Sequence, residues 1–209
     1  MERRRFYTPK EVLLHSMPED CWFSYLGKVY DLTPLCAEYR GDILLQPLLA
    51  SAGTDISHWF DSQTGDVRHY IDPETHCNVP YTPHGRFVHI APPYPTTDWA
   101  NDFGTPWWKN QKYFVGYLTK KPRLIRIINT LSLQQHEIEV CSEETMTEIM
   151  ARYLPFNAHA ASYAWKYNGE VLDMNKTLEE NGIHEETQDI EDQYPPQIHL
   201  YYNDDLTEA

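Results

Sequence analysis

The sequence has few cysteines and lacks the short motifs that mark the common enzyme classes. Its 4 cysteines, among 209 residues, are scattered and form no Cys-x-x-Cys pair, so we expect reduced thiols rather than a disulfide framework. It contains no glycine-rich phosphate loop, no Gly-x-Ser-x-Gly elbow and no His-Glu-x-x-His pair. His76, Cys77, His84 and His89 lack the regular spacing of zinc ligands. We therefore expect neither an enzyme nor a zinc site.

Long apolar runs are also missing. No stretch of about 18 apolar residues occurs, so the sequence predicts no membrane-spanning helix. The basic start, Met1 to Arg5, is followed by no apolar segment of the kind that directs secretion. We expect a cytoplasmic protein.

Positive charge is scarce in the C-terminal third of the chain. Before Pro122 there are 12 Lys and Arg against 14 Asp and Glu, and from Pro122 onward there are 5 against 17, a net charge of −12. Such a surface repels nucleic acid and anionic lipid, so neither is expected as a partner. It suits a basic protein partner, or it simply keeps the chain soluble.

Capping and turn residues predict short elements in the N-terminal half. Residues 8–14 begin with the Thr-Pro-Lys-Glu pattern of a capping box, which predicts a helix. Residues 22–32 are strand formers around a central glycine, which predicts a hairpin. Thr33 is expected to cap a further helix. Apolar clusters of helical spacing over 43–70 predict several short helices, one of them capped by Asp55.

Prolines and large aromatic residues dominate the middle of the chain. The aromatic residues of this segment are Phe87, Trp99, Phe103, Trp107 and Trp108. The segment is too aromatic for a disordered linker, so we expect it to pack on its own domain. A docking surface for a partner is the alternative, because such residues also dominate interface hot spots.

After Pro122 the pattern predicts strands and one amphipathic helix. Residues 123–128 and 137–140 predict a hairpin, and Ser142 is expected to cap a helix. The apolar face of this helix consists of Met146, Ile149, Met150 and Tyr153. Asn168 and Gly169 predict a second hairpin between residues 163–167 and 170–172.

A helical turn is expected at 177–183, an acidic loop at 185–192 and a last strand at 198–202. This order of elements resembles the ubiquitin-like β-grasp fold. The sequence shows no Gly-Gly tail of the kind used in conjugation, so we expect a built-in interaction module rather than a modifier.

The N-terminal half resembles the opening of cytochrome b5 domains. The residues that carry the resemblance are Phe6, Tyr7, Thr8, Glu11, Val12, His15, Trp22 and the run from Gly27 to Thr33. The whole chain is then expected to be an α+β protein. A cytochrome b5-like domain over 6–75 precedes a proline- and tryptophan-rich connecting segment over 76–121, which packs on it. A ubiquitin-like β-grasp domain follows over 122–206.

The resemblance also shows what has changed at the haem site. In cytochrome b5 two histidines hold the haem iron from opposite sides, the first in a His-Pro-Gly-Gly turn. That turn matches residues 39–42, with Tyr39 at the ligand position, and the second position matches Gly65. Replacement of both imidazoles argues against electron transfer of the ordinary cytochrome b5 kind.

Substitute ligands are nevertheless present in the sequence. A Tyr39 phenolate can hold ferric iron, and His69 and Tyr70 are expected one helical turn beyond Gly65, with His58 on the preceding helix. The resulting hypothesis has Tyr39 and His69 as axial ligands of a haem. The alternative is that Tyr39 packs, that both histidines are exposed or hydrogen-bonded, and that side chains fill the pocket.

The three parts together resemble the cytochrome b5 domain-containing protein 1 family across nearly the whole chain. The resemblance implies haem binding and a place in the axoneme of motile cilia, on the radial spokes. Our first hypothesis is a non-enzymatic adaptor of this cytoskeletal complex, with haem as a redox sensor and the acidic domain against a neighbouring subunit. The second hypothesis is a soluble electron carrier of the cytochrome b5 type.

Overall fold

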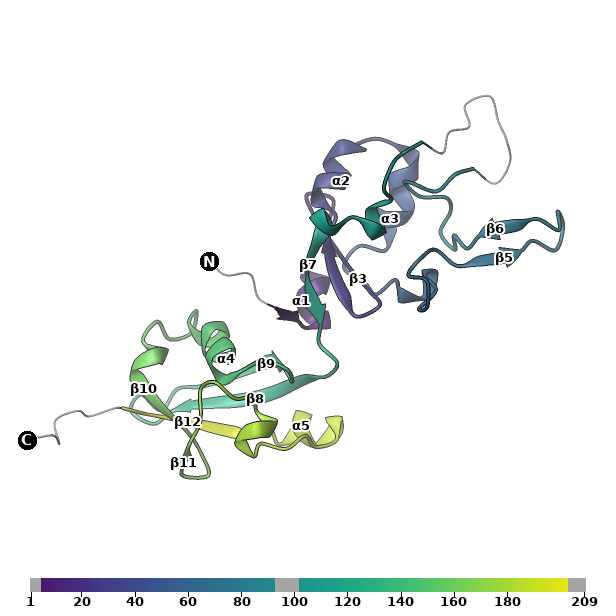
Figure 1. Ribbon diagram of the computed structural model, residues 1–209. Coiled ribbons are helices and arrows are strands. Elements are labelled where there is room, and N and C mark those ends of the chain that lie inside the picture. The colour runs from purple at the N-terminus through teal and green to yellow at the C-terminus, as the bar shows by residue number, and fades with distance from the viewer. Residues whose placement is uncertain (1–4, 93–101, 203–209) are drawn as a thin grey trace, which may run out of the picture. The chain divides into compact units, whose positions relative to one another are not determined.

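The computed structural model describes residues 5–92 and 102–202 and divides the chain into two compact units (Figure 1). The first unit ends at Leu118 and the second begins at Thr119. The elements of the first unit are β1 (Phe6–Tyr7), α1 (Pro9–Leu14), β2 (Ser16–Met17), β3 (Asp20–Tyr25), β4 (Lys28–Asp31), α2 (Thr33–Glu38), η1 (Ile43–Leu45), α3 (Gln46–Ala50), η2 (Ser57–Trp59), β5 (His69–Ile71), β6 (Asn78–Pro80), η3 (Trp107–Lys109), η4 (Gln111–Tyr113) and β7 (Phe114–Leu118).

The first unit is organised around a sheet with the strand order β1-β7-β4-β3-β2. The predicted hairpin is confirmed, because β3 and β4 pair antiparallel and are joined by Leu26 and Gly27 in left-handed conformation, with φ of 48° and 73°. The strand β7 was not predicted. It runs between β1 and β4, and its Gly116 leaves room for the Tyr7 ring, which would lie 2.7 Å from an added Cβ.

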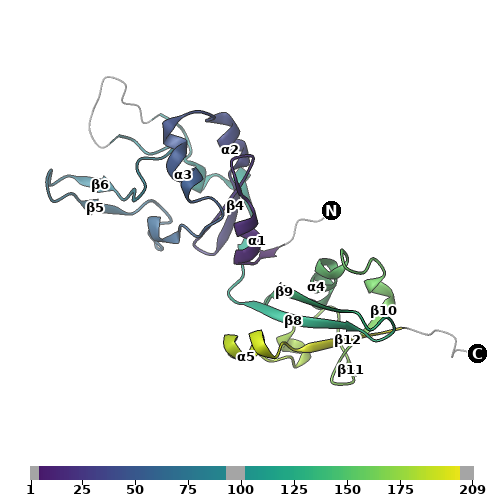
Figure 2. The same cartoon turned by 180° about the vertical axis from the view of Figure 1, so that it is seen from behind.

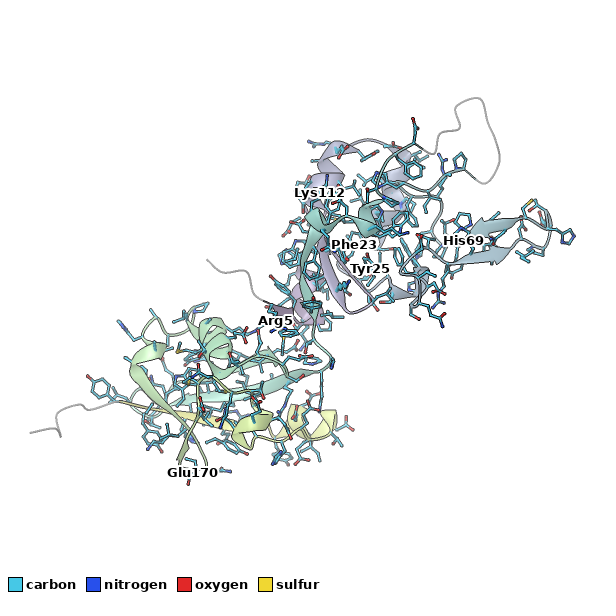
Figure 3. The ribbon with its side chains drawn as sticks, viewed as in Figure 1. Arg5, Phe23, Tyr25, His69, Lys112 and Glu170 are labelled. Carbon is cyan, nitrogen blue, oxygen red and sulfur yellow. The ribbon has the colours of Figure 1, made fainter. Side chains whose placement is uncertain are left out.

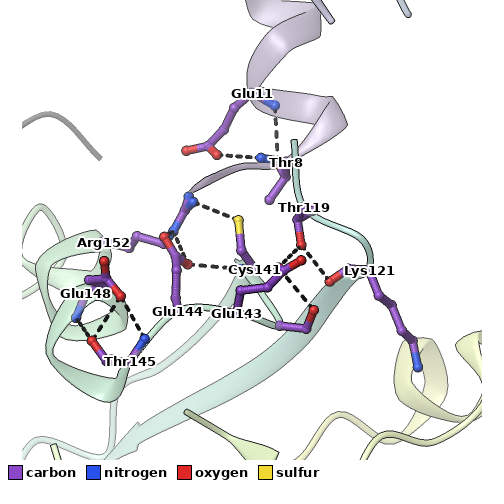
Figure 4. A network of polar contacts seen from close by, with 11 residues as sticks. Thr8, Glu11, Thr119, Lys121, Cys141, Glu143, Glu144, Thr145, Glu148 and Arg152 are labelled. Carbon is purple, nitrogen blue, oxygen red and sulfur yellow. Dashed lines mark hydrogen bonds and ion pairs between the residues drawn. The ribbon is translucent and has the colours of Figure 1, made fainter. Parts of the chain in front are cut away.

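Short helices surround this sheet, as predicted. The capping box of α1 is confirmed: the Thr8 hydroxyl accepts from the Glu11 N–H, and the Glu11 carboxylate accepts from the Thr8 N–H (Figure 4). Thr33 begins α2, but its hydroxyl accepts from the Cys21 N–H instead of capping the helix. Asp55 accepts from Ser57 just before the 3-10 turn η2.

The aromatic middle segment packs into the core of the first unit, as predicted. Phe87 and Trp107 are fully buried, and Trp108 is 5% exposed. Phe103 is half-buried, and Trp99 lies outside the described residues. The segment therefore supplies core side chains to the cytochrome b5-like unit.

A hairpin of β5 and β6 takes the place of the helix expected around His69. The two short strands pair from His69 opposite Pro80 to Ile71 opposite Asn78, and the hairpin extends away from the rest of its unit (Figure 3). The helical prediction is wrong here because residues 72–77 form a turn instead. In this turn Asp72 accepts from the Glu74 N–H and from the Thr75 hydroxyl.

The second unit has the β-grasp topology. Its elements are β8 (Pro122–Asn129), β9 (Gln135–Cys141), α4 (Met146–Tyr153), η5 (Ala160–Ser162), β10 (Tyr163–Tyr167), β11 (Glu170–Val171), η6 (Glu179–Asn181), α5 (Gln188–Gln193) and β12 (Gln197–Tyr202). The strand order is β11-β10-β12-β8-β9, with the central β12 parallel to its neighbour β8. The helix α4 lies along one face of this sheet in both views (Figures 1 and 2). Two hairpins, one helix and a last strand were all predicted.

Two details of the second unit differ from the prediction. The cap of α4 is Thr145, which forms a capping box with Glu148, and Ser142 lies in the turn before it (Figure 4). The expected acidic loop contains the helix α5. This helix is held by the buried carboxylate of Glu191, which the sequence pattern alone did not distinguish from exposed acids.

Two buried ion pairs stabilise the second unit. Arg123 and Glu191 are each 1% exposed, with a distance of 2.8 Å between Nη2 and Oε1. The Arg123 guanidinium also donates to the carbonyls of Ile183 and His184 at 2.8 Å. Arg152 and Glu144 form the second pair, at 2.7 Å between Nε and Oε2 (Figure 4). These contacts offset part of the cost of burying the charges, and Oε2 of Glu191 has no hydrogen-bond partner within the described residues.

No helix among the described residues is long and apolar enough to cross a membrane.

Candidate functional site

The candidate site is the region of the first unit between the two positions matched to haem ligands, a region that side chains fill and that we call the crevice. Tyr39 stands at the first position, directly after α2, where its N–H donates to the Leu35 carbonyl at 3.0 Å. Its side chain is half-buried, and its hydroxyl lies 3.3 Å from Nε2 of His89. Burial raises the pKa of Tyr39, so the protein around this side chain favours the neutral phenol over the phenolate.

His89 is the partner that sequence analysis missed. It adopts a left-handed conformation with φ of 69°, which aims its ring at Tyr39. Its Nδ1 accepts from the Trp107 N–H at 2.9 Å, so in the neutral ring Nε2 carries the proton and donates to Tyr39. The ring of Phe103 stacks on the imidazole at 5.5 Å. Burial lowers the pKa of His89, which favours this neutral form.

The second matched position, Gly65, has no side chain to offer and belongs to a tight loop. Its N–H donates to the Asp61 carbonyl at 2.8 Å, and its φ is 65°. The next residue, Asp66, accepts from the Trp108 indole N–H at 2.9 Å and forms an ion pair with Lys109. Burial would raise the pKa of Asp66, but the hydrogen bonds from Lys109 and Trp108 outweigh it, and the pKa is lowered.

The 3-10 helix η3 therefore connects the surroundings of one ligand position to those of the other. At its start Trp107 contacts His89, the partner of Tyr39, and at its end Trp108 and Lys109 contact Asp66 beside Gly65. Trp107 and Trp108 therefore lie between the surroundings of Tyr39 and those of Gly65.

An aromatic cluster fills the interior of this crevice. The Trp107 ring lies 6.1 Å from Tyr25, 6.0 Å from Phe60 and 6.2 Å from Phe87, and all of these side chains are buried. The Tyr25 ring stacks on Phe60 at 4.5 Å, and its hydroxyl donates to the Trp108 carbonyl. Figure 3 labels Tyr25. Edge-to-face contacts of this kind add to the stability that burial provides.

The packing of the cluster leaves two polar atoms unsatisfied. Within the described residues, the indole N–H groups of Trp59 and Trp107 are buried and have no acceptor. An unpaired buried donor costs about 1–3 kcal/mol. The cluster tolerates this cost because the two rings bury a large apolar area.

These residues do not fit a haem held as in cytochrome b5. Such a haem needs two donors that face each other across a space wide enough for the porphyrin. Here one position holds a tyrosine that is engaged with His89, the other holds Gly65, and Trp107 occupies the interior between them. A group of three or more potential metal ligands is not found anywhere in residues 5–92 and 102–202.

The other predicted site residues lie apart from this crevice. His69 is exposed on β5, with Nδ1 2.9 Å from the Val67 carbonyl, and Tyr70 beside it is 48% exposed (Figure 3). His58 is exposed in η2, next to the buried Trp59. The structure thus brings Tyr39 to His89 and gives His69 a backbone partner of its own. Haem ligation by Tyr39 and His69 stays a prediction.

Comparison with known proteins defines the family. Residues 8–119 match the family model described as "Cytochrome b5-like Heme/Steroid binding domain". The "Cytochrome b5 domain-containing protein 1" of Xenopus laevis is 58% identical over 99% of this chain and 98% of its own length. The chain belongs to the cytochrome b5 domain-containing protein 1 family. The human protein of that name is 55% identical over 99% of this chain and 93% of its own length.

A designed protein described as based on ubiquitin is a structural neighbour of part of this chain. It is 20% identical with a TM-score of 0.33, and the match covers 40% of this chain and 92% of that protein. The family membership and the strand order of the second unit confirm the predicted α+β fold, a cytochrome b5-like domain followed by a ubiquitin-like one.

Proposed function

We propose that this chain is a non-enzymatic adaptor in which the cytochrome b5-like unit is a structural and binding module instead of an electron carrier. The observation that carries the proposal is the path of η3 from His89 to Asp66, with Trp107 buried between the two matched ligand positions. An electron carrier of this family needs a haem held on both sides. The occupied crevice therefore favours the adaptor over the soluble carrier.

The setting of the adaptor follows from the family resemblance. We propose a place in the cytoplasm and cytoskeleton, on the radial spokes of the motile-cilium axoneme, within a large protein complex. From Pro122 onward the sequence contains 17 acidic residues and only 5 basic ones. This charge supports a basic surface of a neighbouring spoke subunit as the partner of the second unit. The same charge disfavours nucleic acid and anionic membranes as partners.

Haem sensing is the finer version of this proposal, and it is supported by the description of the family model as a haem or steroid binding domain. Trp107 is fully buried in the crevice. Haem could therefore bind there only if η3, which carries Trp107, moved out of the crevice. A haemin titration of the full chain, followed by absorption spectroscopy, tests this version.

The titration has a different outcome for each function. The adaptor predicts no sharp Soret band for the wild type and a stronger band for Trp107→Ala, which vacates the crevice. A sharp wild-type band with reversible reduction would support the electron carrier and overturn the proposal. A ferric band that disappears in Tyr39→Phe or His69→Ala would instead support haem sensing through the predicted ligands.

The adaptor role itself is tested in ciliated cells. A tagged full-length chain should co-purify with radial-spoke subunits from isolated axonemes. Added salt should release it, because contacts between exposed opposite charges weaken as the ionic strength rises. Recovery with membranes, or with a reductase in the soluble fraction, would contradict the proposed setting.

A further inference from the structure

Two buried cysteines of the same core cluster lie near each other where β3 meets α2. Cys21, on β3, is fully buried, and Cys36, on α2, is 4% exposed. The backbone of Cys21 is fixed to the start of α2: its carbonyl accepts from the Leu32 N–H at 2.8 Å, and its N–H donates to the Thr33 hydroxyl at 2.9 Å. The Leu32 carbonyl also accepts from the Cys36 N–H at 2.9 Å. The two thiols are near enough to shift each other's pKa.

Only one of the two thiols faces open space. Cys36 lines a cavity of about 330 Å³, whose wall also includes Arg40, Leu45 and Leu49. Cys21 is not part of this wall and is fully buried. A small oxidant has ample room in such a cavity, since a water molecule takes up about 30 Å³ of liquid. An oxidant in the cavity can therefore reach Cys36, and Cys21 is left to react with the oxidised Cys36 in a second step.

The proton is also distributed unevenly between the two thiols. The nearby Cys21 thiol lowers the pKa of Cys36, which makes its thiolate easier to form. The nearby Cys36 thiol, together with burial, raises the pKa of Cys21. Since the thiolate is the reactive form of cysteine, the residue in the cavity wall is also the more nucleophilic one.

We propose that Cys36 is an oxidation site for hydrogen peroxide and that Cys21 resolves it into an intramolecular disulfide. The Cys36 thiolate attacks one oxygen of the peroxide, the O–O bond breaks, and the hydroxide that leaves takes up a proton to become water. The Cys36 sulfenic acid that results is then attacked by the Cys21 sulfur. The S–O bond breaks and a second water leaves. The two thiols lose two hydrogen atoms, and the peroxide is reduced to two waters.

The remaining cysteines provide internal controls. Cys77 is exposed in the turn between β5 and β6, where its thiol donates to the Thr75 carbonyl at 3.5 Å. Cys141 is buried, and its sulfur accepts from the Arg152 guanidinium at 3.2 Å. Exposure alone would make Cys77 the first thiol to oxidise. The paired geometry instead predicts that Cys36 reacts first.

The test uses the reduced full-length chain and hydrogen peroxide. Free thiols are alkylated after each dose, the protein is digested without reduction, and the peptides are identified by mass spectrometry. We expect a linked pair of peptides containing Cys21 and Cys36, an intact mass lower by two hydrogen atoms, and full reversal by a dithiol reductant. The Cys77→Ser variant should behave as the wild type does.

Two variants separate the roles of the paired thiols. Cys21→Ser should trap the sulfenic acid on Cys36, where a dimedone probe labels it, and Cys36→Ser should leave Cys21 unmodified. The wild-type result is decisive even if a variant fails to fold. Oxidation of Cys77 while Cys21 and Cys36 remain fully alkylated would overturn the proposal. Conversion of Cys36 to a sulfinic acid without any link to Cys21 would overturn it as well. The outcome does not depend on whether haemin binds.

Discussion

Replacement of Trp107 by alanine is the most direct test of the filled crevice. The Trp107 side chain is fully buried and contacts the rings of Tyr25, Phe60, Phe87 and Trp108. Truncation of a buried tryptophan to alanine removes this packing and leaves a cavity, which costs about 3–5 kcal/mol. A domain of this size has a free energy of unfolding of about 5–15 kcal/mol, so the first unit should remain folded with a much smaller margin.

The Trp107→Phe variant serves as the matched control. It keeps an aromatic ring against Phe60 and Phe87 but removes the indole N–H that has no acceptor among the described residues. Removal of that unpaired donor returns about 1–3 kcal/mol, which offsets part of the lost contact area. We expect a net loss below about 1.5 kcal/mol, the range of well-tolerated core replacements.

Urea unfolding of the full chain measures both variants. The tryptophans of the first unit report on it by fluorescence, and far-UV circular dichroism follows both units. The midpoint should fall strongly for Trp107→Ala and only slightly for Trp107→Phe, with unchanged slopes. The filled-crevice argument would be refuted if Trp107→Ala lost less than about 1 kcal/mol, or if the two variants were equally destabilised.

Three further predictions concern single interactions. Glu191→Ala should destabilise the second unit by about 3–5 kcal/mol in the same urea assay, because it leaves Arg123 buried without its carboxylate partner. A loss as small as that from replacing an exposed acid would contradict the role of the buried ion pair. Thr145→Ala should cost about 1 kcal/mol in the same urea assay because Thr145 caps α4. Ser142→Ala should cost less, because the Ser142 hydroxyl, within the described residues, donates only to the Glu143 carboxylate; the reverse order would restore the sequence-based cap. Burial lowers the pKa of His89, so its contribution to stability is present above the unfolded pKa of about 6.5 and is lost as the pH falls through the lower folded value. His89→Asn keeps an acceptor and tolerates the left-handed backbone, so melting temperatures measured from about pH 7 to about pH 5 should fall less for the variant than for the wild type. Equal pH profiles would show that His89 does not titrate in this way.

Local signals in the sequence were sufficient for most of the fold. The capping box at Thr8, the glycine turn at Gly27 and the Asn168-Gly169 turn each depend on neighbours a few residues away, and each is confirmed. Ser142 failed as a cap because Thr145 begins α4 and forms a capping box with Glu148. The Thr-x-x-Glu spacing of that box is readable in the sequence, whereas Ser142 has a threonine three residues on.

The candidate site was less predictable because its contacts join distant parts of the chain. Loss of both family histidines was visible in the sequence, at Tyr39 and Gly65. The substitute partner was not, because His89 lies 50 residues beyond Tyr39 in a stretch with no regular pattern. Its left-handed backbone and its contact with Trp107 depend on how the middle segment folds back. The expected helix at His69 failed for a related reason, since strand pairing with Pro80 is also a non-local contact.

The changed ligand positions explain why large aromatic side chains of the middle segment are buried in the first unit. In a cofactor-binding domain the cofactor itself fills an apolar volume, and an empty dry volume costs about 24 cal/mol for each Å³. A chain that has given up both axial histidines has to fill that volume with side chains of its own. Phe87 and Trp107 supply such side chains, and the contacts to His89 and Asp66 hold η3 across the crevice. The buried side chains at η3 thus account for the volume between the two changed ligand positions by packing.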